Sequence, residues 1–253
     1  MFLQGLVWPD LAWPALLAAG LAFLLGGLVK GTLGVGLPLV AVPLLSLFMP
    51  SPLAISLVAV PVLTSNVWQA VDSQAPIRQV RRFWPLLLTL LTATIVTVPL
   101  TLALSVSALN TMLAIAVLTA VVLMGVNPKL NISPRHEKMC SALVGTVSGI
   151  MGGISSLTGP IIITYLTALG LPRETFVRTI SIIYLCGSVP LYVALAVAGR
   201  FGFAEFLLSV LGMVPVFIGM AMGKRIRGRL SEVWFRRVLL GFLIAIAVVL
   251  LFK

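Results

Sequence analysis

Long apolar runs, separated by short polar gaps, dominate the sequence. A membrane-crossing helix needs about 20 apolar residues, and each run has that length or somewhat less. The pattern therefore predicts an all-α polytopic membrane protein with about ten transmembrane or re-entrant segments. The predicted segments span residues 11–29, 33–49, 52–70, 83–104, 107–126, 139–154, 156–170, 175–199, 203–222 and 233–252. Segments one and two form a pair, as do six and seven, and each pair is either two full crossings or a re-entrant hairpin.

Composition supports a lipid bilayer as the surroundings of the chain. Of the 253 residues, 60% are hydrophobic and 9% are charged, whereas soluble domains have about 25% charged residues. No gap is long enough for an extramembrane domain. The net charge of +11 comes from basic residues scattered over several gaps, so we expect no nucleic-acid partner. Asp10 is the only charge before Lys30, which favours a retained first helix over a cleaved signal peptide.

The basic residues alternate between the gaps. The gaps after odd-numbered segments, counting Lys30 in the first, hold 15 of the 17 Lys and Arg residues, and only Arg200 and Lys253 fall on the other side. Since Lys and Arg concentrate in cytoplasmic loops, the odd gaps are predicted to be cytoplasmic and both termini periplasmic, in a bacterial inner membrane.

The two halves of the sequence resemble each other. Gly27, Gly31 and Gly34 match Gly145, Gly149 and Gly152 at a constant offset of 118 residues. We predict a first membrane repeat over residues 1–126, a cytoplasmic linker over 127–138 and a second repeat over 139–253. Each repeat has five segments, an odd number, so the halves run in opposite senses. Inverted repeats are typical of transporters, with the substrate site near the middle of the membrane.

The glycine-rich breaks are the first candidates for chemistry. A broken helix at membrane depth presents free N–H groups and a positive dipole end, which suit an anion. The alternative is close helix packing through small residues, which we favour for Gly27, Gly31, Gly145 and Gly149. The candidate substrate-binding positions at the breaks are Thr32, Gly34, Gly36, Gly152, Gly153, Ser155, Ser156 and Thr158.

Polar side chains inside the segments are further candidates. Lys30 is the only charge in the first break; it either faces a substrate or extends to the cytoplasmic surface as a snorkelling side chain. Ser65 and Asn66 interrupt the third segment, and Ser188 lies at a comparable place in the eighth, beside Tyr184. These groups either bind substrate or form hydrogen bonds between helices.

Several functions are disfavoured by what the sequence lacks. None of the six acidic residues lies in the middle of a segment, whereas cation and proton pathways commonly use a buried carboxylate. Gly223-Lys224 does not form a phosphate-binding loop of the ATPase type, and no cluster suggests a metal, a cofactor or a catalytic triad. The pattern favours a carrier for a small anion over an enzyme.

At its paired glycine breaks the chain resembles the sulfite exporter TauE/SafE family of bacterial membrane permeases. The resemblance rests on Gly27, Gly31, Gly34 and Gly36 with Pro43, and on Gly145, Gly149, Gly152 and Gly153 with Pro160. It extends to the hydroxyl runs that end at Ser56 and Ser181, which it adds to the candidate site. In the first half the glycine cluster is thinned to Gly34-Val35-Gly36-Leu37.

The resemblance implies export of a small sulfur-containing anion, such as sulfite or an organosulfonate. We therefore predict a secondary transporter with a mid-membrane site at the paired breaks, with protons as a candidate coupling ion. A passive anion channel is the alternative, and no cofactor is expected.

Overall fold

The computed structural model describes residues 13–126, 132–133, 135–227 and 232–252, and these form helices without strands. The helices are α1 (Trp13–Leu33), α2 (Leu37–Ser46), α3 (Ser51–Leu57), α4 (Ala59–Asp72), the short 3-10 helix η2 (Ile77–Phe83), α5 (Trp84–Leu102), α6 (Val106–Val126), α7 (Glu137–Ser155), α8 (Gly159–Ala168), α9 (Arg173–Val197), α10 (Phe203–Ile226) and α11 (Glu232–Leu251). The predicted all-α fold is confirmed for these residues.

Every predicted apolar segment corresponds to a helix or to two consecutive helices. Six stretches of the described chain are long and apolar enough to cross a membrane: Trp13–Leu33, Ser51–Asp72, Ile77–Pro99, Val106–Val126, Arg173–Val197 and Phe203–Ile226. In contrast, α2 and α8 have 10 residues each, which gives a length of about 15 Å, or half a bilayer core. The predicted segments 33–49 and 156–170 are therefore half-length helices that follow the longer α1 and α7.

Local sequence explains where these two helix pairs break. Gly34 and Gly36 have φ angles of 85° and 102°, a conformation that side chains with a Cβ atom rarely adopt. Pro38 and Pro160 occupy the second positions of α2 and α8, where proline needs no intrahelical partner for its nitrogen. The chain thus ends one helix and starts another within three residues.

The third predicted segment is two helices instead of one. Pro61 has no N–H to bond with the carbonyl of Leu57, and the hydroxyl of Ser209 on α10 donates to that carbonyl at 2.7 Å. The same hydroxyl accepts the N–H of Val60 at 3.0 Å. A single side chain therefore satisfies both backbone groups at the junction of α3 and α4.

The glycines predicted to pack helices do so. A Cβ atom on Gly27 or Gly31 would collide with the α10 backbone at Val216 or Met220. A Cβ atom on Gly149 would lie 2.6 Å from the carbonyl oxygen of Leu90 on α5. Accordingly α1 pairs with α10 and α7 with α5, while α4 pairs with α9 and α6 with α11.

The second helices of the two broken pairs begin 122 residues apart, not 118. The α2 and α8 helices start at Leu37 and Gly159, and α3 and α9 start at Ser51 and Arg173. Gly27 and Gly31 are four residues apart, as are Gly145 and Gly149. The two glycine patterns can therefore be aligned at offsets that differ by four residues, or about one helical turn. The 118-residue register taken from the glycines is therefore one turn out of step with the helix starts.

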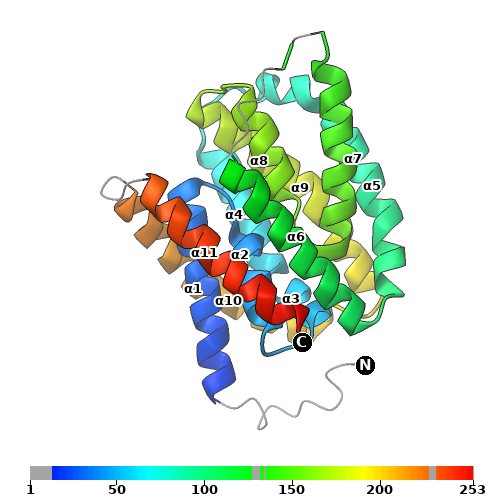
Figure 1. The fold of residues 1–253 in the computed structure, drawn as a ribbon, viewed down its shortest axis with the longest axis vertical. Coiled ribbons are helices and arrows are strands. Elements are labelled where there is room, and N and C mark those ends of the chain that lie inside the picture. Colours follow the sequence, from blue (N-terminus) through cyan, green and yellow to red (C-terminus); the bar gives the residue numbers. More distant parts are fainter. Residues whose placement is uncertain (1–12, 127–131, 134, 228–231, 253) are drawn as a thin grey trace.

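The basic loops gather at one end of the molecule. Figure 1 shows the start of α7 and the turn between α8 and α9 at one end, and the start of α1 and the end of α11 at the other. Residues 127–131 and 134 of the predicted linker 127–138 lie outside the described residues, as do Arg229 and both chain termini. Lys30, which the charge pattern counted as a loop residue, is buried with 1% of its surface exposed, so the pattern rests on the remaining basic residues.

Candidate functional site

The two helix breaks meet at a small internal cavity of about 10 Å³. Its lining comes from both halves of the chain: Gly36, Pro38, Leu39, Ser156, Leu157, Thr158, Gly159, Pro160, Ile163 and Tyr184. This volume is about that of one water molecule. Four predicted positions, Gly36, Ser156, Thr158 and the adjoining Gly34, are thereby brought to one region.

Both short helices start at this cavity. The first N–H groups of a helix have no partner within it, and they form the positive end of the helix dipole. Among the described residues, no side chain caps the start of α2 or of α8. The cavity therefore lies beside two positive helix ends, an arrangement that favours negative charge.

Tyr184 on α9 adds a hydroxyl to this cavity. The side chain is 4% exposed, and its hydroxyl has no hydrogen-bond partner among the described residues. A Cβ atom on Gly159 would lie 2.5 Å from that hydroxyl oxygen, so the phenol reaches the first turn of α8. Nearby, the hydroxyls of Ser156 and Tyr192 are 3.3 Å apart.

Lys30 and Asn66 form a buried polar pair. The Lys30 amine donates to the Asn66 carbonyl oxygen Oδ1 at 2.5 Å, and each residue is 1% exposed. The amide nitrogen Nδ2 of Asn66 has no partner among the described residues. Lys30 therefore does not snorkel to the surface, and the pair offers N–H donors in excess of acceptors.

A wider cavity of about 320 Å³ adjoins this region on the side of the basic loops. We call it the vestibule. Its inner wall includes Gly31, Gly34 and Gln69. Its charged residues are Asp72, Arg173, Glu174, Lys224 and Arg227, three of them positive and two negative.

The vestibule leads towards the buried pair along α4 and α9. Gln69 lies one turn after Asn66 on α4, and its Oε1 accepts a hydrogen bond of 3.3 Å from Ser181 on α9. Tyr184 follows Ser181 by one further turn. The Gln69–Ser181 contact thus stands between the vestibule and the deeper polar groups.

A small cavity lies next to the second break, on the side away from the basic loops. It has a volume of about 30 Å³ and is lined by Gly153, Ile154 and mainly apolar residues. Ser56 donates to the carbonyl oxygen of Arg200 at 2.9 Å at this end. The described conformation is therefore more open on the side of the basic loops.

Several predicted site residues have other contacts. Thr32 donates to the Leu28 carbonyl at 2.8 Å, and Arg227 in turn donates to the Thr32 carbonyl at 2.5 Å. Ser65 donates to the Val62 carbonyl at 3.3 Å. Their hydroxyls are therefore engaged with helix backbone, while Ser56 lies at the far end.

Several predicted site residues at the second break are likewise engaged in hydrogen bonds or packing. Ser155 donates to the Met151 carbonyl at 2.8 Å, and a Cβ atom on Gly152 would collide with Thr158. A Cβ atom on Gly153 would lie 3.0 Å from Cβ of Thr97 on α5. These three positions shape the break, whereas Ser188 is buried on α9 one turn beyond Tyr184.

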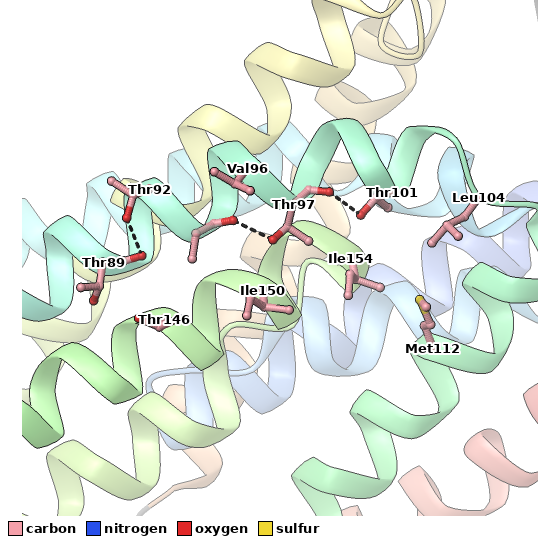
Figure 2. A pocket seen from close by; sticks show the side chains of 11 residues that line it. Thr89, Thr92, Val96, Thr97, Thr101, Leu104, Met112, Thr146, Ile150 and Ile154 are labelled. Atoms are coloured by element: carbon pink, nitrogen blue, oxygen red, sulfur yellow. Dashed lines mark hydrogen bonds between the residues drawn. The ribbon is translucent and has the colours of Figure 1, made fainter.

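A groove larger than the vestibule lies elsewhere, between α5 and α7 (Figure 2). It has a volume of about 630 Å³ and contains several threonines. Most of their hydroxyls donate within their own helix, as Thr97 does to Ala93 at 2.7 Å and Thr101 to Thr97 at 3.0 Å, and Thr89 also donates to the Ala142 carbonyl on α7 at 2.9 Å. The groove therefore presents methyl groups and suits lipid chains better than an anion.

The sequence pointed to Tyr184 only as a polar neighbour of Ser188, and it gave no site role to Gln69 or the vestibule charges. Gln69 and Tyr184 each follow a candidate residue on the same helix, so helical spacing is a signal for them. The vestibule charges lie at the ends of α4, α9 and α10, where the charge pattern identified them only as loop residues.

Comparison with protein families gave one match. Residues 18–250 match the family described as sulfite exporter TauE/SafE. Comparisons with curated proteins and with solved structures found no match.

Proposed function

Because the chain belongs to the sulfite exporter TauE/SafE family, we propose that it is a secondary transporter that exports a small anion, with sulfite or an organosulfonate as the preferred substrate. The anion would bind near the middle of the membrane, between the paired helix breaks and the Lys30–Asn66 pair. Gly34, Gly36, Ser156, Thr158 and Tyr184 would complete this site.

The buried excess of hydrogen-bond donors is the observation that carries the proposal. A lysine amine and an amide NH2 group together offer more N–H donors than the single acceptor Oδ1 of Asn66 can use. Unused donors in a dry interior are costly, and an oxyanion supplies the missing acceptors. The positive ends of α2 and α8 would add to its stabilisation.

We further propose that the two halves form inverted repeats around this site. Two features support this: the 122-residue spacing shared by the starts of α2 and α8 and of α3 and α9, and the exchange of partners between the halves, α1 with α10 and α7 with α5. In such an arrangement the two breaks would face opposite compartments in turn.

The charge pattern supports export as the direction of transport. With the basic loops in the cytoplasm and both termini in the periplasm, the vestibule would receive anions from inside the cell. Its positive residues would raise the local concentration of anions. A passive channel is the second candidate, but the narrow cavity at the opposite end favours a carrier.

Efflux from proteoliposomes tests this proposal. We expect saturable efflux of sulfite or of a sulfonate, and no measurable flux of Na⁺. Lys30→Ala should weaken the apparent affinity by about 1–3 kcal/mol, the cost of a lost charge-assisted bond. Lys138→Ala, which alters an exposed lysine at the start of α7, is the matched control. Transport of a cation with none of the anions would overturn the proposal, and rapid flux without saturation would favour the channel.

A further inference from the structure

Lys30 is the one charged residue that is buried among those the structure describes. It lies in α1, one turn before the first break, and Asn66 is its one hydrogen-bond partner in the described chain. Asn66 is neutral. A lysine cation at this depth would therefore have no countercharge, a state that low-dielectric surroundings disfavour strongly.

The neighbouring elements supply no countercharge at this depth. The charged residues on α4, α9 and α10 near the vestibule are Asp72, Arg173, Glu174, Arg178, Lys224, Arg225 and Arg227. Most lie in the terminal turns of their helices or, like Arg227, just beyond them, next to or beyond the vestibule. Arg178 lies in the second turn of α9, where it donates to the Ala75 carbonyl, and α2 has no titratable residue. The titratable groups at the depth of the breaks are the hydroxyls of Tyr184 and Tyr192 and the thiol of Cys186 on α9.

We propose that Lys30 takes up one proton together with the substrate anion and releases both on the other side of the membrane. The inference rests on the function proposed above and deepens it: it assigns the coupling ion and restricts the substrate to monovalent anions. Loaded with both, the site has no net charge. A divalent anion would leave one uncompensated negative charge in the membrane.

Each step of the cycle balances in charge. In the empty carrier the neutral Lys30 amine donates one N–H to Oδ1 of Asn66. A proton from vestibule water binds the lone pair of Nζ as the anion enters, and the anion accepts hydrogen bonds from Nζ and from the unused Nδ2 of Asn66. At the opposite face the anion leaves and the proton returns to water, so the carrier resets without charge.

A competing role for Lys30 is purely structural, with the amine fixed to Asn66 throughout. The two roles differ in what moves with the anion. Methanesulfonate is a suitable probe because it remains a monoanion across the accessible pH range, so any proton that moves must be carried by the protein.

The experiment measures radiolabelled methanesulfonate and protons together in proteoliposomes, with a pH dye inside and the membrane potential clamped. We expect one proton per anion, faster net flux when the anion side is acidic, and no dependence on potential. A lone monoanion would instead shift its equilibrium distribution by about 50-fold per 100 mV.

Two substitutions of Lys30 separate the effect of its positive charge from its ability to take up and release a proton. Lys30→Arg keeps a permanent cation, so anion-for-anion exchange should persist while net flux falls at least tenfold. Lys30→Met removes the proton carrier, so any residual flux should lose its proton and respond to the potential. The control Lys138→Met should retain the stoichiometry of the unmodified protein.

The inference is overturned if the unmodified protein moves methanesulfonate saturably without protons, or if Lys30→Arg retains net flux with one proton per anion. The measurement on unmodified protein decides the matter even if the variants fold poorly. Absence of saturable flux for every anion would refute the proposed function itself, which is a different outcome.

Discussion

Replacing Asn66 by aspartate should make the proposed site repel its anionic substrate. The two side chains have the same shape, so Asn66→Asp places a carboxylate oxygen where Oδ1 now accepts the Lys30 amine at 2.5 Å. Lys30 then has a permanent internal partner. The substitution also removes the Nδ2 donor, which has no partner in the described chain.

The expected loss of affinity has two parts. Losing a hydrogen bond from the amide to a charged acceptor costs about 1.5–3 kcal/mol. At a distance of about 5 Å and an effective dielectric constant of about 20, repulsion between the carboxylate and a bound anion adds about 3 kcal/mol. Together these reduce anion affinity by at least about a thousandfold, since about 1.4 kcal/mol corresponds to a factor of ten.

Binding and stability measured on the same samples test this reasoning. Anion binding to Asn66→Asp should be undetectable by calorimetry, while its thermal midpoint should stay within a few degrees of the unmodified protein because Lys30 compensates the new charge. Asn110→Asp is the comparison: Asn110 is also buried and accepts a hydrogen bond from Ser51, but the structure gives it no cation. It should therefore be strongly destabilised. Unchanged anion affinity in Asn66→Asp would refute the placement of the site at this pair.

Three further predictions concern packing, the cavity and topology. Gly149→Ala should lower the free energy of unfolding by about 1–3 kcal/mol through overpacking against α5, whereas Gly241→Ala, which has open space around the added Cβ, should not; thermal unfolding in detergent measures both. Tyr184→Phe removes a buried hydroxyl without a described partner, so it should leave the thermal midpoint unchanged or higher while raising the KM for sulfite about tenfold, the worth of about 1.4 kcal/mol. Cysteines placed at the exposed positions Arg78 and Ser105 should react with impermeant reagents from the cytoplasmic and periplasmic sides respectively, and labelling of both from one side would contradict the predicted orientation.

Most of the helical layout could be predicted because a bilayer leaves few alternatives. A membrane-buried backbone must satisfy its polar groups within helices, so each apolar run became a helix. For the α1–α2 and α7–α8 pairs the sequence left full crossings and re-entrant hairpins open. It did not predict that α2 and α8 alone are half-length, because hydropathy counts apolar residues without recording where the backbone turns. The division of the third segment depends on Ser209, 148 residues beyond Pro61 in the sequence, and no local pattern reports such a contact.

The sequence indicated which residues could form the candidate site, but not which way their side chains point. Lys30 and Asn66 were both identified as polar groups inside apolar segments, yet their contact spans 36 residues and depends on how α1 crosses α4. Thr32 and Ser155 looked equally suitable in sequence. Hydroxyls on helices often bond to carbonyls one turn back, and whether they do so is decided by side-chain rotation, which composition does not encode.

The packing contacts restrict how this molecule could alternate between two open states. Gly31 and Gly149 bring α1 against α10 and α7 against α5 so closely that a single Cβ atom would collide with the partner backbone. Interfaces packed this tightly shift as units instead of deforming gradually. The contact between the vestibule and the Lys30–Asn66 pair is instead made by side chains. The Gln69–Ser181 hydrogen bond of 3.3 Å joins α4 and α9 there. If access alternates, the α1–α10 and α5–α7 pairs would therefore move as rigid bodies, and the change would break side-chain contacts between α4 and α9, next to Lys30 and Asn66. Arrival of an anion at that pair and opening of the path beside it would then be physically linked.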